Sequence, residues 1–370
     1  MESSGGKNSW NMFRGDNGRT GASYSSRLSK SPHLLWVIEL GPLISSPVVD
    51  KGVLYASTIT GRVFAIQINQ RQIKWHSNIG SPIVSTPLIQ DSVLVTATFD
   101  SWIKETKFLG KNLVLALNAN TGEKIWNFEI DGGAFSSPVI AHDMVIIGTM
   151  NKGLHAIDKT GNPKWTFNTQ GEVWSSPSFN GELIFVGSDD GHLYCLDSEG
   201  KLQWKTKLKG KIRSSSPCLS EDNPNMMFIG TQNGAMYCLN QQNGSIKWEN
   251  QITKPISSSP ATSKEKVFFA ASDRKIYCFD CNTGLKAWEF MSGDRIWSSP
   301  AISIKDETLF FGSMDSHIYG IDIKTGKKTW EFPTMGIIDS SPCIAYNMLF
   351  MGGRDGLLYA FGEYNKSPWM

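Results

Sequence analysis

The sequence has no long hydrophobic run and no excess of charge of one sign. Over 370 residues its formal net charge is +2, and no basic cluster occurs, so we expect neither a transmembrane segment nor a nucleic-acid surface. The first residues, 1–7, contain no apolar core typical of a signal peptide. We therefore expect a cytoplasmic monomer, with a periplasmic or secreted form whose leader has been removed as the alternative.

The residue groupings that metal sites and disulfides need are also missing. None of the six cysteines adjoins another, and the six histidines occur singly. Cys278 and Cys281 form a Cys-x-x-Cys pair, but residues an odd number apart on a strand point to opposite faces, and no second pair completes a zinc set. We predict that the cysteines fill small buried positions and that the chain holds no metal.

Repetition is what the sequence has in abundance. The phrase Ala-Leu-Asn-Ala-Asn-Thr-Gly-Glu-Lys-Ile-Trp spans 116–126, and full or shortened copies of it span 156–165, 195–204, 238–248, 278–288 and 320–330. All six copies have glycine four residues before tryptophan. The phrase predicts a strand end, a turn in which glycine supplies a positive φ, and the start of another strand.

A second phrase, Ser-Pro or Thr-Pro, recurs about every 40 residues, a period typical of propeller blades or solenoids. Its prolines are Pro47, Pro87, Pro138, Pro177, Pro217, Pro260, Pro300 and Pro342. Between the two phrases lie two apolar runs around a hairpin turn, as in 185–194. Four short strands per repeat make one blade. The sequence therefore predicts an all-β chain that folds as an eight-bladed β-propeller of four-stranded antiparallel blades.

The ends of the chain indicate how this ring closes. Trp36 stands at the spacing of an outer-strand tryptophan but has no blade before it, while the last repeat nearly ends after 357–361. We predict that the strand around Trp36 completes the last blade; the alternative is that Trp369 begins that strand and Trp36 only covers it. Residues 1–30 are then a leader segment packed on the ring, and residues 31–370 form one propeller domain.

These phrases resemble the PQQ-like β-propeller repeat family, named after pyrroloquinoline quinone (PQQ), whose tryptophan-docking phrase is Ala-x-Asp-x-x-Thr-Gly-Lys-x-x-Trp. The segment 10–21, Trp-Asn-Met-Phe-Arg-Gly-Asp-Asn-Gly-Arg-Thr-Gly, is also similar to one that often precedes such propellers. The resemblance implies the fold. It does not imply one function, because the family contains quinoprotein alcohol dehydrogenases, a lipoprotein that assists outer-membrane barrel assembly, and kinase sensor domains.

The resemblance also implies what a quinone enzyme of this fold would need. Such enzymes hold PQQ with several cations, a calcium ion, a stacked tryptophan and usually a disulfide between adjacent cysteines, and they place an aspartate beside the quinone. This chain has no adjacent cysteines and few suitable charges. We therefore expect neither PQQ nor calcium as a cofactor and place the chain outside the dehydrogenase branch.

The largest interruption of the repeat lies in its second copy. Residues 101–111 are inserted between the expected second and third strands, and they include the apolar side chains Trp102, Ile103, Phe108 and Leu109. Apolar side chains are costly to leave in water, so we predict a lid or wall over the central funnel, with Trp102 as a ligand-binding residue. A tolerated surface insertion is the alternative.

Two repeat positions vary in size and charge, and we expect both to flank the channel mouth on the insertion face. The residue three before each proline forms an inner ring: Ile44, Val84, Phe135, Trp174, Ser214, Ser257, Trp297 and Asp339. A position in the hairpin turn forms an outer ring: Ile59, Phe99, Met150, Asp189, Gln232, Ser272, Met314 and Arg354. The predicted ligand-binding residues are Phe99, Trp102, Phe135, Trp174, Asp189, Arg213, Gln232, Trp297 and Met314. An alternative is that Trp174 and Trp297 plug the channel, while Asp339 and Arg354 form an ion pair in the closing blade.

These features predict a binding or scaffold protein that captures a partner protein or a small organic ligand at the funnel face. The alternative is an enzyme without quinone, such as a cyclase or isomerase, with Asp339 as general acid or base and Arg354 as electrostatic stabiliser. A PQQ-dependent dehydrogenase is the least favoured interpretation. An open cavity with a buried Asp339 would favour a ligand receptor or an enzyme, and a filled channel would favour a scaffold.

Overall fold

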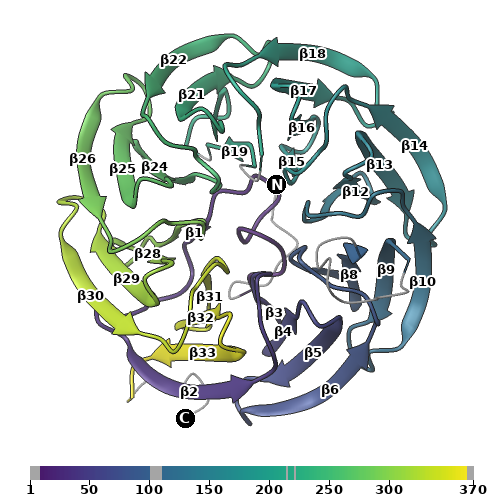
Figure 1. Ribbon diagram of the computed structural model, residues 1–370, viewed down its shortest axis with the longest axis vertical. Coiled ribbons are helices and arrows are strands. Elements are labelled where there is room, and N and C mark those ends of the chain that lie inside the picture. The colour runs from purple at the N-terminus through teal and green to yellow at the C-terminus, as the bar shows by residue number, and fades with distance from the viewer. Residues whose placement is uncertain (1–8, 101–110, 214–215, 221, 365–370) are drawn as a thin grey trace.

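The structure is a computed structural model that describes residues 9–100, 111–213, 216–220 and 222–364. Eight antiparallel sheets are arranged as a ring around a central channel (Figure 1). These residues form strands and no α-helix, and none of them belongs to a helix that could span a membrane. The predicted eight-bladed, all-β propeller is confirmed.

The first four blades follow one another along the chain, each running from the channel outward. Blade 1 contains β3 (Val48–Asp50), β4 (Val53–Ser57), β5 (Arg62–Gln67) and β6 (Gln72–Asn78); blade 2 contains β7 (Leu88–Gln90), β8 (Val93–Ala97), β9 (Leu113–Asn118) and β10 (Lys124–Glu129). Blade 3 contains β11 (Val139–Ala141), β12 (Met144–Gly148), β13 (Gly153–Asp158) and β14 (Pro163–Asn168); blade 4 contains β15 (Ser178–Phe179), β16 (Ile184–Gly187), β17 (His192–Leu196) and β18 (Leu202–Lys207).

The second half of the ring repeats this order and ends on strands from both ends of the chain. Blade 5 contains β19 (Cys218–Leu219), β20 (Met226–Gly230), β21 (Ala235–Asn240) and β22 (Ile246–Gln251); blade 6 contains β23 (Ala261–Ser263), β24 (Lys266–Ala270), β25 (Lys275–Asp280) and β26 (Lys286–Met291). Blade 7 contains β27 (Ala301–Ser303), β28 (Thr308–Gly312), β29 (His317–Asp322) and β30 (Lys328–Pro333), with β1 (Ala22–Ser23) added to its inner edge. Blade 8 contains β31 (Cys343–Ala345), β32 (Met348–Gly352), β33 (Leu357–Gly362) and β2 (His33–Glu39).

The strands of one blade differ in burial because of where they lie. The second strand of blade 7, β28, is buried along its whole length, since Leu309 and Phe311 pack toward blade 6 and Phe310 packs toward blade 8. The outermost strand, β30, alternates between partly buried and exposed residues, because one of its faces meets water. The hydrophobic core is therefore divided into layers between adjacent blades.

The glycine and the tryptophan of the first phrase meet across these layers. The indole N–H of Trp75 in blade 1 donates to the carbonyl of Ala119 in blade 2 at 3.0 Å. A Cβ added to Gly122, which has a φ of 77°, would lie 2.6 Å from the same indole. Five further tryptophans donate to the next blade in this way: Trp126, Trp165, Trp204, Trp248 and Trp288. Each glycine is thus required both by its turn and by the ring of the preceding blade.

The ring closes as predicted. Strand β2 pairs antiparallel with β33, and Trp36 lies opposite Ala360. The outer strand of the last blade therefore comes from the N-terminal end of the chain. The competing residue, Trp369, lies outside the described residues.

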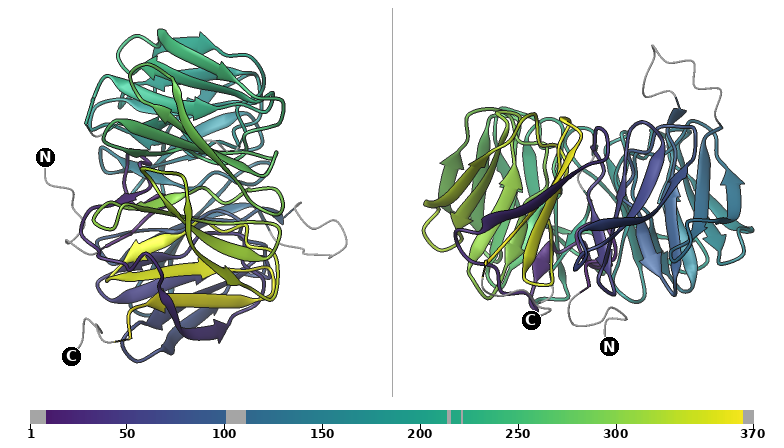
Figure 2. Two further views of the ribbon diagram at one scale, coloured as in Figure 1. Left: turned by 90° about the vertical axis from the view of Figure 1, so that its left-hand side faces the viewer. Right: turned by 90° about the horizontal axis from the view of Figure 1, so that it is seen from below.

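The leader segment is tied to the ring more closely than its sequence indicates. It runs along one face of the ring (Figure 2) and pairs with the channel-facing edges of the innermost strands. Leader carbonyls accept backbone N–H groups from blades 2, 4, 5, 6 and 7, and Trp10 exchanges two backbone hydrogen bonds with Val49 of blade 1. The leader thus covers the free edges of the innermost strands, which would otherwise be prone to aggregation. We call the end of the channel on this face the closed end.

Two arginines of the leader complete this closure. Arg19 donates to the carbonyls of Ser137 and Pro138 in blade 3 and of Pro177 in blade 4. Arg14 donates to carbonyls of blades 6 and 7, those of Pro260 and Ser299. Burial lowers the pKa of Arg14 to about 10 and that of Arg19 to about 9, so both stay charged at neutral pH. The leader therefore holds blades together by charge-assisted hydrogen bonds as well as by strand pairing.

Candidate functional site

The hydroxyl residue before each repeat proline forms a belt around the channel. The N–H of Ser46 donates to the hydroxyl of Thr86 in the next blade at 3.0 Å, and the N–H of Ser341 in blade 8 closes the circle by donating to Ser46 at 2.9 Å. Five other junctions are linked in the same way. This serine belt consists of Ser46, Thr86, Ser137, Ser176, Ser216, Ser259, Ser299 and Ser341. Sequence reasoning used these residues only to count blades.

The serine one position earlier fixes the loop to its own blade. Ser45 donates to the carbonyl of Ser57 at 2.7 Å, and Ser340 both donates to and accepts from the backbone of Gly352. With these two hydroxyls bound to the framework, the residue before them is held at the channel wall. The hydrogen bonds of the Ser-Ser-Pro phrase therefore explain why the inner-ring residue faces the channel.

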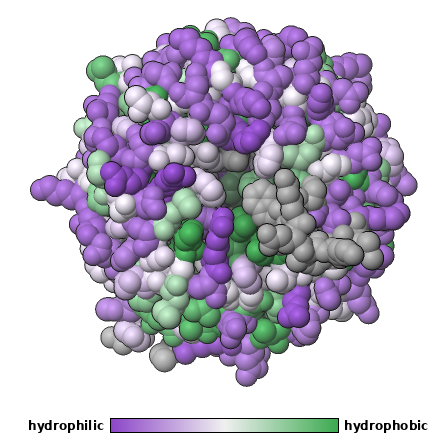
Figure 3. Space-filling view, viewed as in Figure 1, coloured by the Kyte–Doolittle hydropathy of each residue, from purple (hydrophilic) through white to green (hydrophobic). Residues whose placement is uncertain are grey.

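The inner ring surrounds a cavity of about 380 Å³ on the channel axis. Its lining residues are Phe13, Ile44, Ser46, Val84, Thr86, Phe135, Ser137, Trp174, Ser176, Arg213, Ser257, Trp297, Ser299, Asp339, Ser341 and Arg354. On the side away from the leader, the molecular surface is hollowed near its centre (Figure 3). Phe13 of the leader also contributes to the wall, which sequence reasoning missed because nothing placed the leader at the channel.

Blade 5 departs from the expected inner ring. Ser214 was predicted to line the channel, but the lining residue of that blade is Arg213. The N–H of Ile212 donates to a carbonyl of the preceding blade, as the N–H groups of Val173 and Ile256 do. Val173 and Ile256 directly precede the inner-ring residues of their blades, so the residue after Ile212 holds the inner-ring position of blade 5. The loop has one extra serine before Pro217, and counting back from the proline therefore gave a register error of one residue. Ser214 itself lies outside the described residues.

One wall of the cavity is aromatic. Phe135 and Trp174, of blades 3 and 4, have ring centroids 5.3 Å apart. Phe99 was predicted to contact ligand, but it is not a lining residue; it contacts Trp174 edge-on at 6.1 Å and supports that ring. The indole N–H of Trp174 donates to Glu172 at 2.7 Å, and the guanidinium of Arg213 lies 4.6 Å from the ring centroid. These contacts hold Trp174 in the wall by a hydrogen bond and a cation–π interaction. It therefore lines the cavity without filling it.

Arg213 is held from behind by an acidic residue of the predicted outer ring. Its Nε and Nη2 atoms both donate to the carboxylate of Asp189, whose side chain is only 5% exposed. Lys211 lies 3.3 Å from the same carboxylate. Hydrogen bonding to Asp189 raises the pKa of Arg213. Asp189 was predicted to contact ligand, but it lies behind the cavity wall and positions Arg213.

The opposite wall, in blade 8, carries a second arginine–aspartate pair. Nε and Nη2 of Arg354 lie 2.6 Å and 2.5 Å from Oδ2 of Asp339. The other oxygen, Oδ1, is buried and has no hydrogen-bond partner among the described residues. Burial raises the pKa of Asp339, and the charge of Arg354 opposes this shift. Both residues line the cavity, so the ion pair and the open cavity occur together.

The remaining predicted residues divide into three groups. Trp297 of blade 7 lines the cavity and is 39% exposed. Gln232 and Met314 are not in the lining; the side-chain amide of Gln232 donates to the hydroxyl of Ser257 at 3.1 Å, and the backbone N–H of Met314 donates to the carbonyl of Arg295 at 2.9 Å. Trp102 lies outside the described residues. The outer ring thus mainly supports the inner ring and contributes only Arg354 to the cavity wall.

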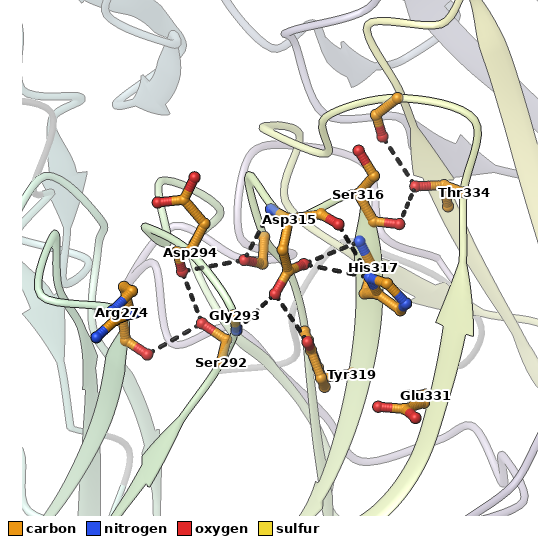
Figure 4. A network of polar contacts seen from close by, with 12 residues as sticks. Arg274, Ser292, Gly293, Asp294, Asp315, Ser316, His317, Tyr319, Glu331 and Thr334 are labelled. Atoms are coloured by element: carbon orange, nitrogen blue, oxygen red, sulfur yellow. Dashed lines mark hydrogen bonds and ion pairs between the residues drawn. The ribbon is translucent and has the colours of Figure 1, made fainter.

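A polar network between blades 6 and 7 shows which acidic residues are structural. Asp315 accepts the N–H of Gly293 at 2.7 Å and the hydroxyl of Tyr319 at 2.8 Å (Figure 4). Burial and the hydrogen bond to Asp315 raise the pKa of Tyr319. The same aspartate–tyrosine bond occurs at Asp190–Tyr194, Asp273–Tyr277 and Asp355–Tyr359. These aspartates fix the hairpins in which they lie.

The cysteines fill buried positions, as predicted. All six are buried and none forms a disulfide. Burial raises the pKa of Cys195, Cys238 and Cys278 to about 12, so these thiols stay protonated and unreactive at neutral pH.

The cavity does not fit a calcium–quinone cofactor. PQQ carries three carboxylates, whereas both cavity arginines already face a carboxylate of the protein. Calcium takes six to eight oxygen ligands, and within the described ranges no group of three or more His, Cys, Asp or Glu residues could hold a metal ion. The charged residues of this cavity suit a ligand with less charge.

Fold and repeat phrases together define a PQQ-like β-propeller. Residues 111–323, more than half of the chain, match the family model described as the beta-propeller of the beta-alanine-activating enzyme. The chain belongs to this family. No curated protein matches the sequence.

Solved structures share the fold at low sequence identity. A europium-containing methanol dehydrogenase superposes with a TM-score of 0.84 at 15% identity, over 97% of this chain and 98% of that chain. BamB from Moraxella catarrhalis gives 0.77 at 18% identity, over 90% and 100%. The computationally designed Ika8 protein gives 0.75 at 15% identity, over 88% and 98%. An enzyme and a designed protein share this architecture, so function must be argued from the cavity.

Proposed function

We propose that this propeller binds a small organic molecule in its central cavity. The observation that carries the proposal is a cavity of about 380 Å³ with an aromatic wall and a buried oxygen of Asp339 that has no partner within the described ranges. Ligand sites are concave and mostly apolar, with a few placed polar groups. A channel that served only to support the ring would gain stability from being filled.

The test is a titration with 8-anilinonaphthalene-1-sulfonate, a fluorescent probe for apolar sites. Val84 lines the cavity, so Val84→Trp should fill it; Ile73→Trp places the same indole on an exposed position of β6 as a control. We expect saturable binding to the wild type and to Ile73→Trp, and its loss in Val84→Trp. Equal binding by all three proteins would overturn the proposal.

A quinone ligand is tested in parallel by tryptophan fluorescence. PQQ is titrated with and without calcium, on protein checked for retained small molecules by native mass spectrometry. We expect no calcium-dependent quenching, because the arginines are already paired. Saturable quenching that Trp174→Phe removes would restore the quinone interpretation.

An enzymatic use of the same cavity is the second candidate. It is favoured by one observation: burial raises the pKa of Asp339, as suits a general acid or base. Native mass spectrometry would then record conversion of a bound molecule, and Asp339→Asn should retain the molecule unconverted. Retention of an unchanged mass by the wild type supports the binding function instead.

Docking of a partner protein on the open face is the third candidate. Met335 is 84% exposed and Met291 is 53% exposed, and both follow or end outer strands close to loops that lead to the inner ring. Exposed methionines suit adaptable protein contacts. Such docking would survive Val84→Trp, which separates it from ligand binding inside the cavity.

A further inference from the structure

The two arginine–aspartate pairs of the cavity differ in how the carboxylate oxygens are bonded. Both carboxylate oxygens of Asp189 are occupied, Oδ1 by Nε of Arg213 and Oδ2 by its Nη2 and by Lys211. Asp339 instead receives both contacts from Arg354 on Oδ2, and its Oδ1 is buried without a partner among the described residues. Blades 4 and 5 hold the first pair and blade 8 the second, so they lie across the ring.

An unpaired buried carboxylate oxygen is costly and needs a donor. The charge of Asp339 is already balanced by Arg354 at 2.5 Å. Asp189 also faces two cations, but there Lys211 is largely exposed, and water weakens the repulsion between its charge and that of Arg213. Oδ1 of Asp339 is buried, so a second cation there would be repelled by Arg354 more strongly. The donor that fits is therefore neutral, and a hydroxyl group satisfies this requirement.

The arginine of the pair supplies the complementary group. A guanidinium has five N–H donors in a fixed plane, and the side chain of Arg354 is 38% exposed at the cavity wall. Its Nη1 has no acceptor in the described part of the chain. A hydroxyl can donate to Asp339 while its neighbour accepts from Arg354, which matches two hydroxyls on adjacent carbons.

Trp297 adds an apolar surface in the adjacent blade. It lines the same cavity with 39% of its surface exposed, and an indole face packs well against the C–H face of a saturated ring. The belt residues Ser299 and Ser341 bring further hydroxyl groups to this side of the wall. Acceptor, donor and flat apolar surface thus occur together in blades 7 and 8.

We propose that Asp339, Arg354 and Trp297 bind a neutral polyhydroxylated ring, a sugar or cyclitol with adjacent hydroxyl groups. This rests on the proposed ligand-binding function and names the class of ligand. Asp339 accepts from one hydroxyl, Arg354 donates to the next, and Trp297 covers the ring face.

The test uses calorimetric titration of the full chain with four probes. Methyl α-D-glucopyranoside and myo-inositol carry adjacent hydroxyls, cyclohexanol carries one hydroxyl, and 4-aminobutyrate is a zwitterion. We expect the two polyols to bind about tenfold or more tightly than cyclohexanol, and no saturable binding of 4-aminobutyrate, since a hydrogen bond to a charged group is worth about a factor of 10 to 100.

Three variants locate the binding, each checked for native structure by near-ultraviolet circular dichroism. Asp339→Asn should weaken polyol binding about 10-fold or more, whereas the matched control Asp189→Asn should change it by less than about threefold, because Asp189 has no oxygen left for a ligand. Trp297→Ala, at a more exposed position, should weaken it about fivefold and keeps the test valid if Asp339→Asn does not fold.

The other outcomes overturn the assignment in distinct ways. Failure of both polyols to bind, with 8-anilinonaphthalene-1-sulfonate still bound, rejects the polyol class and leaves the cavity's binding function intact. Binding of 4-aminobutyrate that depends on Asp339 assigns the site formed by Asp339, Arg354 and Trp297 to a zwitterion instead. Failure of every probe, the fluorescent one included, rejects the cavity as a ligand site.

Discussion

The two ends of the channel treat their polar groups differently. At the closed end, strand edges are paired by the leader, and the buried guanidiniums of Arg14 and Arg19 are bonded to carbonyls of four blades. At the open end, the inner ring surrounds a cavity, and the buried Oδ1 of Asp339 has no partner among the described residues. Nε of Arg14 and Oδ1 of Asn17 in the leader are also buried without a partner among the described residues, but only Asp339 lines the cavity. A buried unpartnered group in a cavity wall is suited to a ligand. The closed end therefore serves the ring and the open end serves function.

The largest effect should come from the closed end. Arg19→Met removes the donor from carbonyls in blades 3 and 4 and from that of Phe13, which leaves several buried acceptors unpaired. We expect the free energy of unfolding to fall by about 3–5 kcal/mol, as when one partner is removed from a buried charged network. Urea denaturation measures it. Arg27→Met, at an exposed leader position, is the control and should change stability little.

A smaller effect should come from the serine belt between the two ends. Ser46→Ala removes the hydroxyl that accepts the N–H of Ser341 and leaves that buried donor unpaired where the ring closes. We expect a loss of about 1–3 kcal/mol in the free energy of unfolding. Ser31→Ala, on the exposed surface, is the matched control, and an equal loss in both variants would show that the belt does not hold blades together.

The open end should respond to pH. Burial raises the pKa of Asp339, so the folded chain binds the carboxyl proton more tightly than the unfolded chain does. The contribution of Asp339 to stability therefore falls as pH rises from the unfolded pKa, about 3.9, through the folded pKa. A hydroxyl donor prefers the ionised carboxylate, so affinity for methyl α-D-glucopyranoside should fall as pH is lowered through the folded pKa, by up to about tenfold per pH unit. Asp339→Asn should remove this dependence; an unchanged pH profile in that variant would assign the titration to another group.

The smallest stability effect should come from Trp297. Its side chain is partly exposed at the mouth, so Trp297→Ala should change the free energy of unfolding by about 1 kcal/mol or less. Trp248 is the contrasting tryptophan, since it is 9% exposed and its indole N–H donates to the backbone carbonyl of Cys281; Trp248→Ala should cost about 3–5 kcal/mol. Thermal and urea unfolding of the two variants would compare the two roles directly, and a similar loss in both would contradict them.

The repeat phrases predicted most of the fold, because each residue in them has one structural partner per blade. The glycine of each of the six phrase copies lies against a tryptophan of the preceding blade, and the strand around Trp36 closes the ring. The inner ring was also predictable in part, since a position that varies among fixed neighbours faces the channel. Phe135, Trp174, Trp297 and Asp339 all line the cavity.

The leader and the outer ring could not be predicted in the same way. Arg14 and Arg19 bind backbone carbonyls, which leave no mark in the sequence, and they occur once, so no repeat revealed them. The predicted register of blade 5 was wrong by one residue because of an added serine. The inner-ring position was therefore assigned to Ser214, whereas Arg213 occupies it. Asp189 and Gln232 vary as lining residues would, but they lie behind the wall and support it.

The most direct test of the division between the two ends is the affinity of Trp297→Ala for 8-anilinonaphthalene-1-sulfonate under conditions where the protein is fully folded. An open end that binds ligands predicts a dissociation constant about fivefold higher than that of the wild type, with unfolding free energy nearly unchanged. A dissociation constant equal to that of the wild type would contradict the account and place the probe outside the central cavity.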